Sequence, residues 1–135
     1  MCIRDRQYAS ENFTSTTKSI EQSAFFEGLK FSNDNYKANN LLFKIKQWGL
    51  DKNIIQEAPK IKQAEKTLEE CGELIIAVAT DNKEEIADAI GDIVVTLVLQ
   101  AEMQGLSFIE CIQGAYDTIK DRKGKLINGK FVKEQ

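Results

Sequence analysis

The sequence predicts an all-α protein, a four-helix bundle followed by a short β-hairpin. Apolar residues recur at helical spacing in four segments, and glycine, proline or short polar breaks separate these segments. Near the C-terminus, Asn128-Gly129 stands between two apolar runs, and Asn-Gly is the preferred two-residue hairpin turn. The length of 135 residues fits one domain. We therefore expect a loosely ordered N-terminal extension at residues 1–33 and a helical domain at residues 34–135.

The first two helices have recognisable ends. Apolar spacing predicts a helix over Asn35–Trp48, and Gly49 after it is a natural stop. Residues 49–58 form a connection. The second helix, at 59–79, begins with Pro59, because the fixed φ angle of proline suits the first turn of a helix.

The last two helices are bounded by capping residues and glycine. The Thr-Asp-Asn break at residues 80–82 provides N-cap chemistry for the third helix, which runs to Gln104 and stops at Gly105. Ser107 with Glu110 forms a capping box that opens the fourth helix. Four helices of this size pack naturally as a bundle.

Two of these helices carry more apolar surface than one small bundle covers. The apolar stripe of the 59–79 helix consists of Ile61, Ala64, Leu68, Cys71, Ile75 and Val78. The broad apolar face of the third helix consists of Ile86, Ile90, Ile93, Val94, Leu97 and Ala101. We therefore expect a homodimer or a homotetramer.

The composition excludes several kinds of chemistry. The chain has no histidine, which removes Ser-His-Asp and Cys-His catalysis and histidine-ligated zinc. Its three cysteines form no CxxC motif, so neither a disulfide framework nor a zinc knuckle is indicated. A net charge of −3 gives no reason to expect a nucleic-acid polymer as partner. No apolar run approaches the roughly 20 residues of a membrane span, and no signal-peptide pattern is present, so we expect a cytoplasmic protein without membrane contact.

The acidic residues of the second and third helices form an unusual pattern. The second helix contains Glu69, Glu70 and Glu73, and the third contains Glu84, Glu85, Asp88 and Asp92. Two helices that fold back on each other at the 80–82 break would bring these carboxylates together. Gathered carboxylates repel unless a cation lies among them, and hard divalent cations prefer oxygen ligands. The pattern therefore predicts a Mg²⁺ (or Mn²⁺) site.

The register of this helical hairpin decides which acids meet. If the turn is centred on Asp81, Glu70 lies level with Asp92, because both helices advance about 1.5 Å per residue. Glu73 then lies nearly level with Asp88. Spacings of three and four residues keep the acids of each helix on one face.

A turn centred nearer Ala79 gives a second register. Glu73 then pairs with Glu85, and Glu70 pairs with Asp88. The sequence leaves both registers open. It also leaves open a non-enzymatic reading, in which the acids are only the solvated face of a helical dimerisation module.

At these residues the chain resembles the MazG-like, all-α nucleoside triphosphate pyrophosphohydrolases. The signature of that family is E-E-x-x-E followed by E-x-x-D at the head of an apolar run. Residues 69–73 read E-E-C-G-E, and residues 85–95 read E-I-A-D-A-I-G-D-I-V-V. The likeness covers roughly Leu41 to Val132. The basic segment at 119–125 is similar to the phage-type branch of the family.

The second half of the signature fits in two ways. If the apolar run aligns Asp92 with the family aspartate, the family glutamate falls on Ala89, and the neighbouring Asp88 would have to serve instead. If Glu85 and Asp88 form the matched pair, Asp92 is an additional acid. Both matches retain three candidate metal ligands, Glu70, Glu73 and Asp88.

The resemblance implies a MazG-type fold and cleavage of a nucleoside triphosphate between its α and β phosphates, which yields a nucleoside monophosphate and pyrophosphate. It implies Mg²⁺ or Mn²⁺ as cofactor, held by residues from the set Glu70, Glu73, Glu85, Asp88 and Asp92. Glu69 is the candidate to orient or deprotonate the attacking water. A phosphoribosyl-ATP pyrophosphatase-like activity is the alternative within the same architecture.

The basic end of the fourth helix supplies the candidate substrate-binding residues, Lys120, Arg122 and Lys123. They can bind the outer phosphates, or they can simply complement the helix dipole. Trp48 and Phe43 can stack on a base, but their helical spacing is more typical of core residues. We expect these two aromatic residues in the core.

Overall fold

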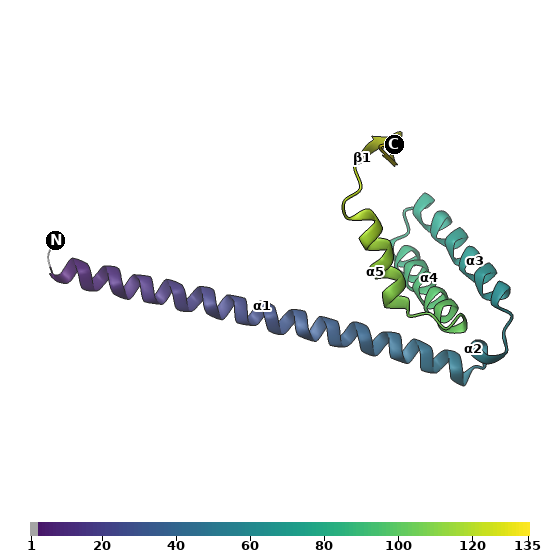
Figure 1. The fold of residues 1–135 in the computed structure, drawn as a ribbon, viewed down its shortest axis with the longest axis horizontal. Helices are drawn as coiled ribbons and strands as arrows, with labels where there is room; N and C mark the ends of the chain where they lie inside the picture. The colour runs from purple at the N-terminus through teal and green to yellow at the C-terminus, as the bar shows by residue number, and fades with distance from the viewer. Residues whose placement is uncertain (1–2) are drawn as a thin grey trace. The chain divides into compact units, whose positions relative to one another are not determined.

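The computed structural model describes the backbone of residues 3–135, and side chains from residue 23 onward except those of residues 25, 26 and 31. The elements are α1 (Ile3–Asp51), α2 (Ile54–Glu57), α3 (Lys60–Ala79), α4 (Lys83–Met103), α5 (Phe108–Ile119), β1 (Gly124–Ile127) and β2 (Lys130–Lys133) (Figure 1). The predicted all-α fold with a C-terminal hairpin is confirmed. Within the described residues, no helix has an apolar stretch long enough to cross a bilayer.

The chain divides into two compact units, Met1–Phe43 and Lys44–Gln135. The first unit contains the part of α1 from Ile3 to Phe43, so the described residues 3–33 of the expected extension are helical. The second unit contains the end of α1 and all later elements. The expected boundary between residues 33 and 34 stays a prediction.

The end of α1 corrects two expectations. The helix expected over Asn35–Trp48 is part of the longer α1, and Gly49 does not stop it. Gly49 is buried instead, and a Cβ atom there would overlap the Leu99 side chain of α4. The connection expected over 49–58 contains the one-turn helix α2, which follows Asn53 in the left-handed region (φ 58°).

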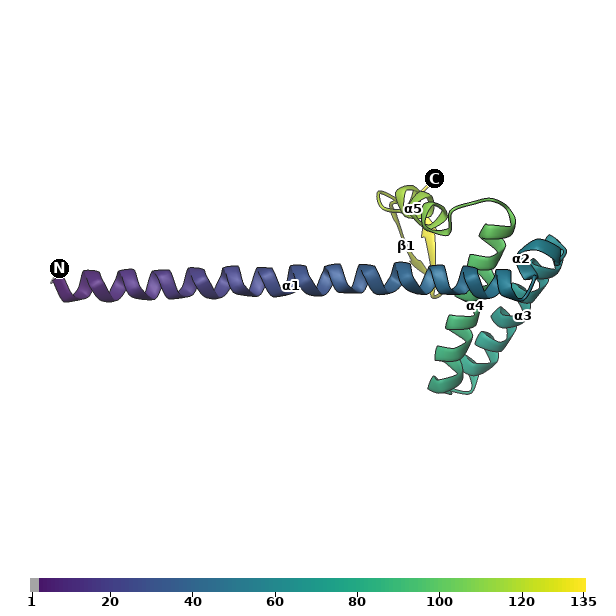
Figure 2. The same ribbon diagram turned by 90° about the horizontal axis from the view of Figure 1, so that it is seen from below.

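Helices α3 and α4 form an antiparallel hairpin, and both ribbon views show them side by side (Figures 1 and 2). Between them Asp81 adopts a left-handed conformation (φ 51°). The Asn82 side chain accepts a hydrogen bond of 3.3 Å from the Glu85 backbone N–H, which confirms the predicted N-cap. Because α3 ends at Ala79 and α4 begins at Lys83, the turn is centred on Asp81, as in the first of the two predicted registers.

The face that α3 turns toward α4 is not the predicted apolar stripe. Its buried residues are Gln63, Glu70 and Ala77, which recur at the seven-residue spacing of one helical seam. Half of the stripe lies one position further along (Ala64, Cys71 and Val78), about 100° around the helix, and the other half lies two positions earlier (Ile61, Leu68 and Ile75), about 160° from the seam. Its largest members are exposed in the single chain: Ile61, Leu68 and Ile75 retain 66%, 73% and 70% of their accessible surface.

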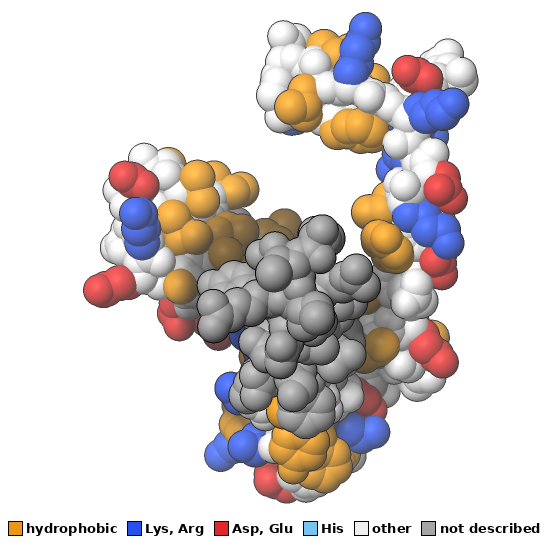
Figure 3. Space-filling model, turned by 90° about the vertical axis from the view of Figure 1, so that its left-hand side faces the viewer, with side chains coloured by type: hydrophobic (Ala, Val, Ile, Leu, Met, Phe, Trp, Pro, Cys, Tyr) orange, Lys and Arg blue, Asp and Glu red, His pale blue; other side chains and the backbone are white. Residues whose placement is uncertain are grey.

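Helix α4 supplies most of the small core. The buried apolar residues in the described part of the chain are Ala77, Ala89, Val98, Leu99, Ala101 and Met103. Many larger apolar side chains remain on the surface, and they gather into visible patches (Figure 3). The second unit alone therefore leaves much of its apolar surface in contact with water.

The C-terminal elements follow their predicted signals. Gly105 takes a positive φ (70°) after α4, and the Ser107 hydroxyl accepts a 3.3 Å hydrogen bond from the Glu110 N–H at the start of α5. Strands β1 and β2 pair antiparallel around Asn128 and Gly129, whose φ angles are 50° and 74°. Two positive φ angles are what an Asn-Gly hairpin turn requires.

Candidate functional site

Glu70 is a buried carboxylate on the α4-facing side of α3. It is 5% exposed, although acidic side chains are rarely buried without a partner. Its Oε1 atom lies 2.8 Å from the Nζ atom of Lys66. Its Oε2 atom is also buried, and no hydrogen-bond donor among the described residues reaches it. An unpartnered buried acceptor costs about 1–3 kcal/mol, and more when it is charged, so the burial of this oxygen is unfavourable by itself.

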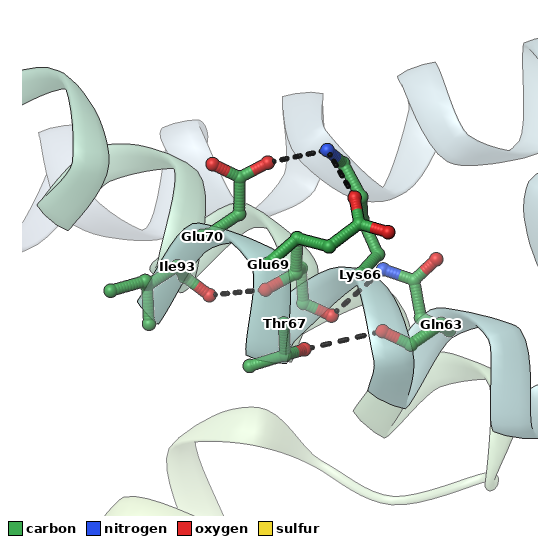
Figure 4. A network of polar contacts seen from close by, with 7 residues as sticks. Gln63, Lys66, Thr67, Glu69, Glu70 and Ile93 are labelled. Atoms are coloured by element: carbon green, nitrogen blue, oxygen red, sulfur yellow. Dashed lines mark hydrogen bonds and ion pairs between the residues drawn. The ribbon is translucent and has the colours of Figure 1, made fainter. Parts of the chain in front are cut away.

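Lys66 holds the two neighbouring carboxylates of α3 together. Its ammonium lies between Glu70 and Glu69, and the Nζ–Oε2 distance to Glu69 is 3.1 Å (Figure 4). The hydrogen bonds to Glu70 and then to Glu69 raise the pKa of Lys66 above its ordinary value. The lysine side chain is 51% exposed, so one end of this cluster is buried and the other is open to water.

A pocket of about 270 Å³ joins Glu70 to α4, and we call it the Glu70 pocket. Asp92 lines the same pocket, although Asp92 itself is exposed. Gln63 and Thr96 contribute polar groups to the wall, and Trp48 contributes an aromatic one. The structure thus brings Glu70 and Asp92 to one site, as the register centred on the 80–82 turn requires.

Buried and partly buried hydrogen bonds next to Glu70 support this arrangement. The Gln63 side chain donates a 3.1 Å hydrogen bond to the backbone carbonyl of Thr96 across the helical hairpin (Figure 4). The Thr67 hydroxyl donates to the Gln63 carbonyl at 3.3 Å, and the Thr96 hydroxyl donates to the Ile93 carbonyl at 2.8 Å. Only the Gln63–Thr96 bond joins the two helices, and it holds their register next to Glu70, whereas the two hydroxyl bonds lie within α3 and within α4.

Glu73 and Glu85 line a second pocket of about 340 Å³ near the 80–82 turn, which we call the Glu73 pocket. Both carboxylates are exposed. This pairing is the one expected for the second register, although the turn itself follows the first. Asp88 is exposed and lines neither pocket.

The five candidate metal ligands are therefore distributed rather than gathered. Within the described residues, no group of three or more Cys, Asp or Glu side chains lies close enough to hold a metal ion. The pair in the Glu70 pocket still fits Mg²⁺, because this ion keeps several waters and needs only one or two carboxylates besides substrate phosphates. The unpartnered oxygen of Glu70 gives such an ion a binding atom. The ligand set stays a prediction.

The remaining predicted site residues lie elsewhere on the surface. Glu69 is 64% exposed and binds Lys66. Lys120 follows α5 and pairs with Asp117 at 3.1 Å, while Arg122 and Lys123 are exposed. None of these four predicted residues lines the Glu70 pocket. Their contacts with phosphates stay a prediction.

Trp48 corrects an expectation and adds a candidate. It was expected in the core, as was Phe43, but the two residues are 46% and 64% exposed. Trp48 is instead one of the residues that line the Glu70 pocket. Sequence reasoning also missed Lys66, although its spacing of three and four residues from two glutamates was a usable signal.

Comparison with known proteins places this geometry in a family. The model of the MazG nucleotide pyrophosphohydrolase domain matches residues 60–127, which include α3, α4 and both acidic motifs. The chain therefore belongs to the MazG nucleotide pyrophosphohydrolase family.

One curated relative is an uncharacterised 18.2 kDa protein from the rep-hol intergenic region of Haemophilus phage HP1. It is 35% identical over 69 residues, which cover 51% of this chain and 42% of the relative. The chain thus spans less than half the length of that phage protein, and the similarity agrees with the phage-type branch. No solved structure matches the chain.

Proposed function

We propose that this chain is a metal-dependent nucleoside triphosphate pyrophosphohydrolase of the cytoplasm. It cleaves an NTP or dNTP into a nucleoside monophosphate and pyrophosphate, with Mg²⁺ or Mn²⁺ as cofactor. The proposal is supported by membership of the MazG family. It is also supported by the pocket that contains Glu70 and Asp92.

The observation that carries the proposal is the unpartnered oxygen of Glu70. A carboxylate that served only stability would gain from a second hydrogen-bond donor, because an unpaired buried acceptor is costly. Oε2 has none among the described residues. This arrangement is expected of a ligand-binding carboxylate that is held ready for a cation.

In this mechanism Glu70 and Asp92, which line one pocket, would hold the metal that the triphosphate needs. The bound metal supplies neutralisation of the phosphate charge and polarisation of the attacked phosphorus. Phosphoryl transfer depends mainly on positioning and charge stabilisation, so the chain needs no nucleophile of its own. Glu69 is placed at the exposed edge of the cluster, where it can orient a water molecule.

The other candidate residues complete the proposal. Glu73 and Glu85 share the second pocket and can hold a further cation or its waters. In the sequence, Asp88 lies between Glu85 of the Glu73 pocket and Asp92 of the Glu70 pocket. It completes the ligand set that the family signature implies. Lys120, Arg122 and Lys123 bind the outer phosphates.

Trp48 is the candidate for base recognition. Trp48 is about half exposed and lines the pocket that holds Glu70, so a nucleotide bound there through its phosphates would have an aromatic residue in the same pocket. Every base has a π-face, and stacking on an aromatic side chain tolerates different bases. This position suits a broad rather than a narrow base preference.

The exposed apolar stripe of α3 supports the predicted homodimer or homotetramer. Leu68 and Ile75 expose 73% and 70% of their surface, and burial of such side chains stabilises an interface by about 1.5–3 kcal/mol each. Oligomerisation through this stripe would leave the Glu70 side of α3 facing α4.

The test is a panel of nucleoside triphosphates assayed for pyrophosphate release with Mg²⁺. Wild-type protein and Glu84→Gln should be active, since Glu84 is exposed and lines neither pocket. Glu70→Gln should be inactive. Phosphoribosyl-ATP is included in the same panel, because its hydrolysis would indicate the alternative phosphoribosyl-ATP pyrophosphatase-like activity. Absence of pyrophosphate from every substrate, together with no metal-induced rise in melting temperature, would favour the non-enzymatic dimerisation module.

A further inference from the structure

Lys66 already supplies a positive charge to Glu70. Its Nζ atom lies 2.8 Å from Glu70 Oε1 and 3.1 Å from Glu69 Oε2. The two carboxylates differ in surroundings, because 7% of the Glu70 side chain is exposed and 64% of the Glu69 side chain is. The ammonium thus occupies one oxygen of the buried carboxylate, while the other oxygen has no donor among the described residues.

A divalent cation on Glu70 would lie close to this ammonium, since both would bind the same carboxylate. Like charges at such a separation repel, and beside a buried group the surroundings screen this repulsion poorly. The lysine has an alternative position. It is half exposed, and the exposed Glu69 on the same helix can keep the ammonium when it leaves Glu70.

We propose that Lys66 is an internal counterion of the Glu70 pocket, which occupies Glu70 in the metal-free protein and moves toward Glu69 when a divalent cation binds. The inference rests on the proposed metal role of Glu70. Lys66 compensates the buried charge while the metal is absent, and the same contact weakens metal binding. Lys66 is therefore a positioning residue that sets the metal affinity of the site.

The test is calorimetric titration of the full chain with Mn²⁺, combined with thermal melting without metal. Lys66→Met removes the charge and keeps an unbranched side chain. It should bind Mn²⁺ about tenfold more tightly than wild type, a coupling of ordinary size between two competing ligands. The metal-free variant should melt at a lower temperature, because the Glu70 charge then lacks its partner.

Lys62→Met is the matched control. Lys62 lies on the same helix and pairs with Glu65 at 2.6 Å, but it does not line the Glu70 pocket. The control changes the net charge equally and should bind Mn²⁺ as wild type does. Lys66→Arg keeps the charge and should also retain wild-type affinity.

The outcomes separate this inference from the proposed function. If Lys66→Met does not fold, Lys66→Gln replaces it with the same expectation of tighter binding. Equal or weaker Mn²⁺ binding by the charge-removing variants overturns the counterion role. Even with that result, the proposed metal site is retained if wild type binds Mn²⁺ and Glu70→Gln does not. No Mn²⁺ binding by wild type overturns both proposals.

Discussion

The side chain of Gln63 donates a buried hydrogen bond of 3.1 Å to the backbone carbonyl of Thr96, 33 residues away on the facing helix. This contact joins α3 to α4 within the pocket that contains Glu70 and Asp92. A helix can slide along its neighbour in steps of one turn, and a directional bond between the two helices opposes such sliding. Gln63 therefore helps to determine which acids meet.

Replacement of Gln63 with leucine should lower the free energy of unfolding by about 1 kcal/mol, the usual net value of one hydrogen bond. The loss of stability stays moderate because the Thr96 carbonyl is part of the α4 backbone, so it can still accept a hydrogen bond within that helix. Gln47→Leu is the control, since its 3.0 Å bond to Asp51 is exposed. Urea denaturation without metal measures both variants. Equal stability of Gln63→Leu and wild type would show that the bond does not fix the register.

Glu73→Gln should abolish metal-dependent pyrophosphate release and leave the metal-free melting temperature unchanged or higher. Glu73 is exposed and shares its pocket with Glu85, so removal of one charge relieves repulsion between them. Activity assays and circular dichroism melting of the same samples measure both effects. A clear drop in metal-free helicity would instead identify Glu73 as a structural residue.

Trp48→Leu should raise KM for nucleoside triphosphates about fivefold or more and leave kcat nearly unchanged. Stacking of a base on an aromatic side chain contributes about 1–3 kcal/mol, and this binding energy is present before and during the reaction. Trp48→Phe keeps an aromatic face and should restore most of the affinity. Steady-state kinetics with one purine and one pyrimidine substrate measure the change. An unchanged KM would remove Trp48 from the substrate site.

Leu68→Glu should weaken self-association at least about tenfold, because a charge would replace a side chain whose burial contributes about 1.5–3 kcal/mol. Leu68 is the most exposed of the large apolar side chains in the α3 stripe, at 73%. Ala87→Glu introduces the same charge on an exposed position of α4 outside the stripe and serves as control. Sedimentation velocity over a range of concentrations measures both. Identical behaviour of the two variants would place the interface elsewhere.

Much of the local structure could be predicted from particular residues. Asn82 and Ser107 cap the helices that they were expected to cap, and Asn128-Gly129 forms the expected turn. These signals act within a few residues of the chain, so they depend little on the rest of the fold. Gly49 was misread because a glycine that ends a helix and a glycine that permits close packing are identical in sequence. Only the position of Leu99 separates the two.

The amino-acid sequence by itself determined where α4 and α5 begin, that the acids fall on two adjacent helices, and that the chain ends in a hairpin. Only the tertiary structure decided how α3 is rotated about its own axis, and therefore which of its faces packs against α4. That rotation buries Glu70 beside Lys66 and turns Leu68 outward. The physical reason is that helical periodicity tells which residues share a face, whereas the choice of the face that meets α4 depends on contacts between distant residues.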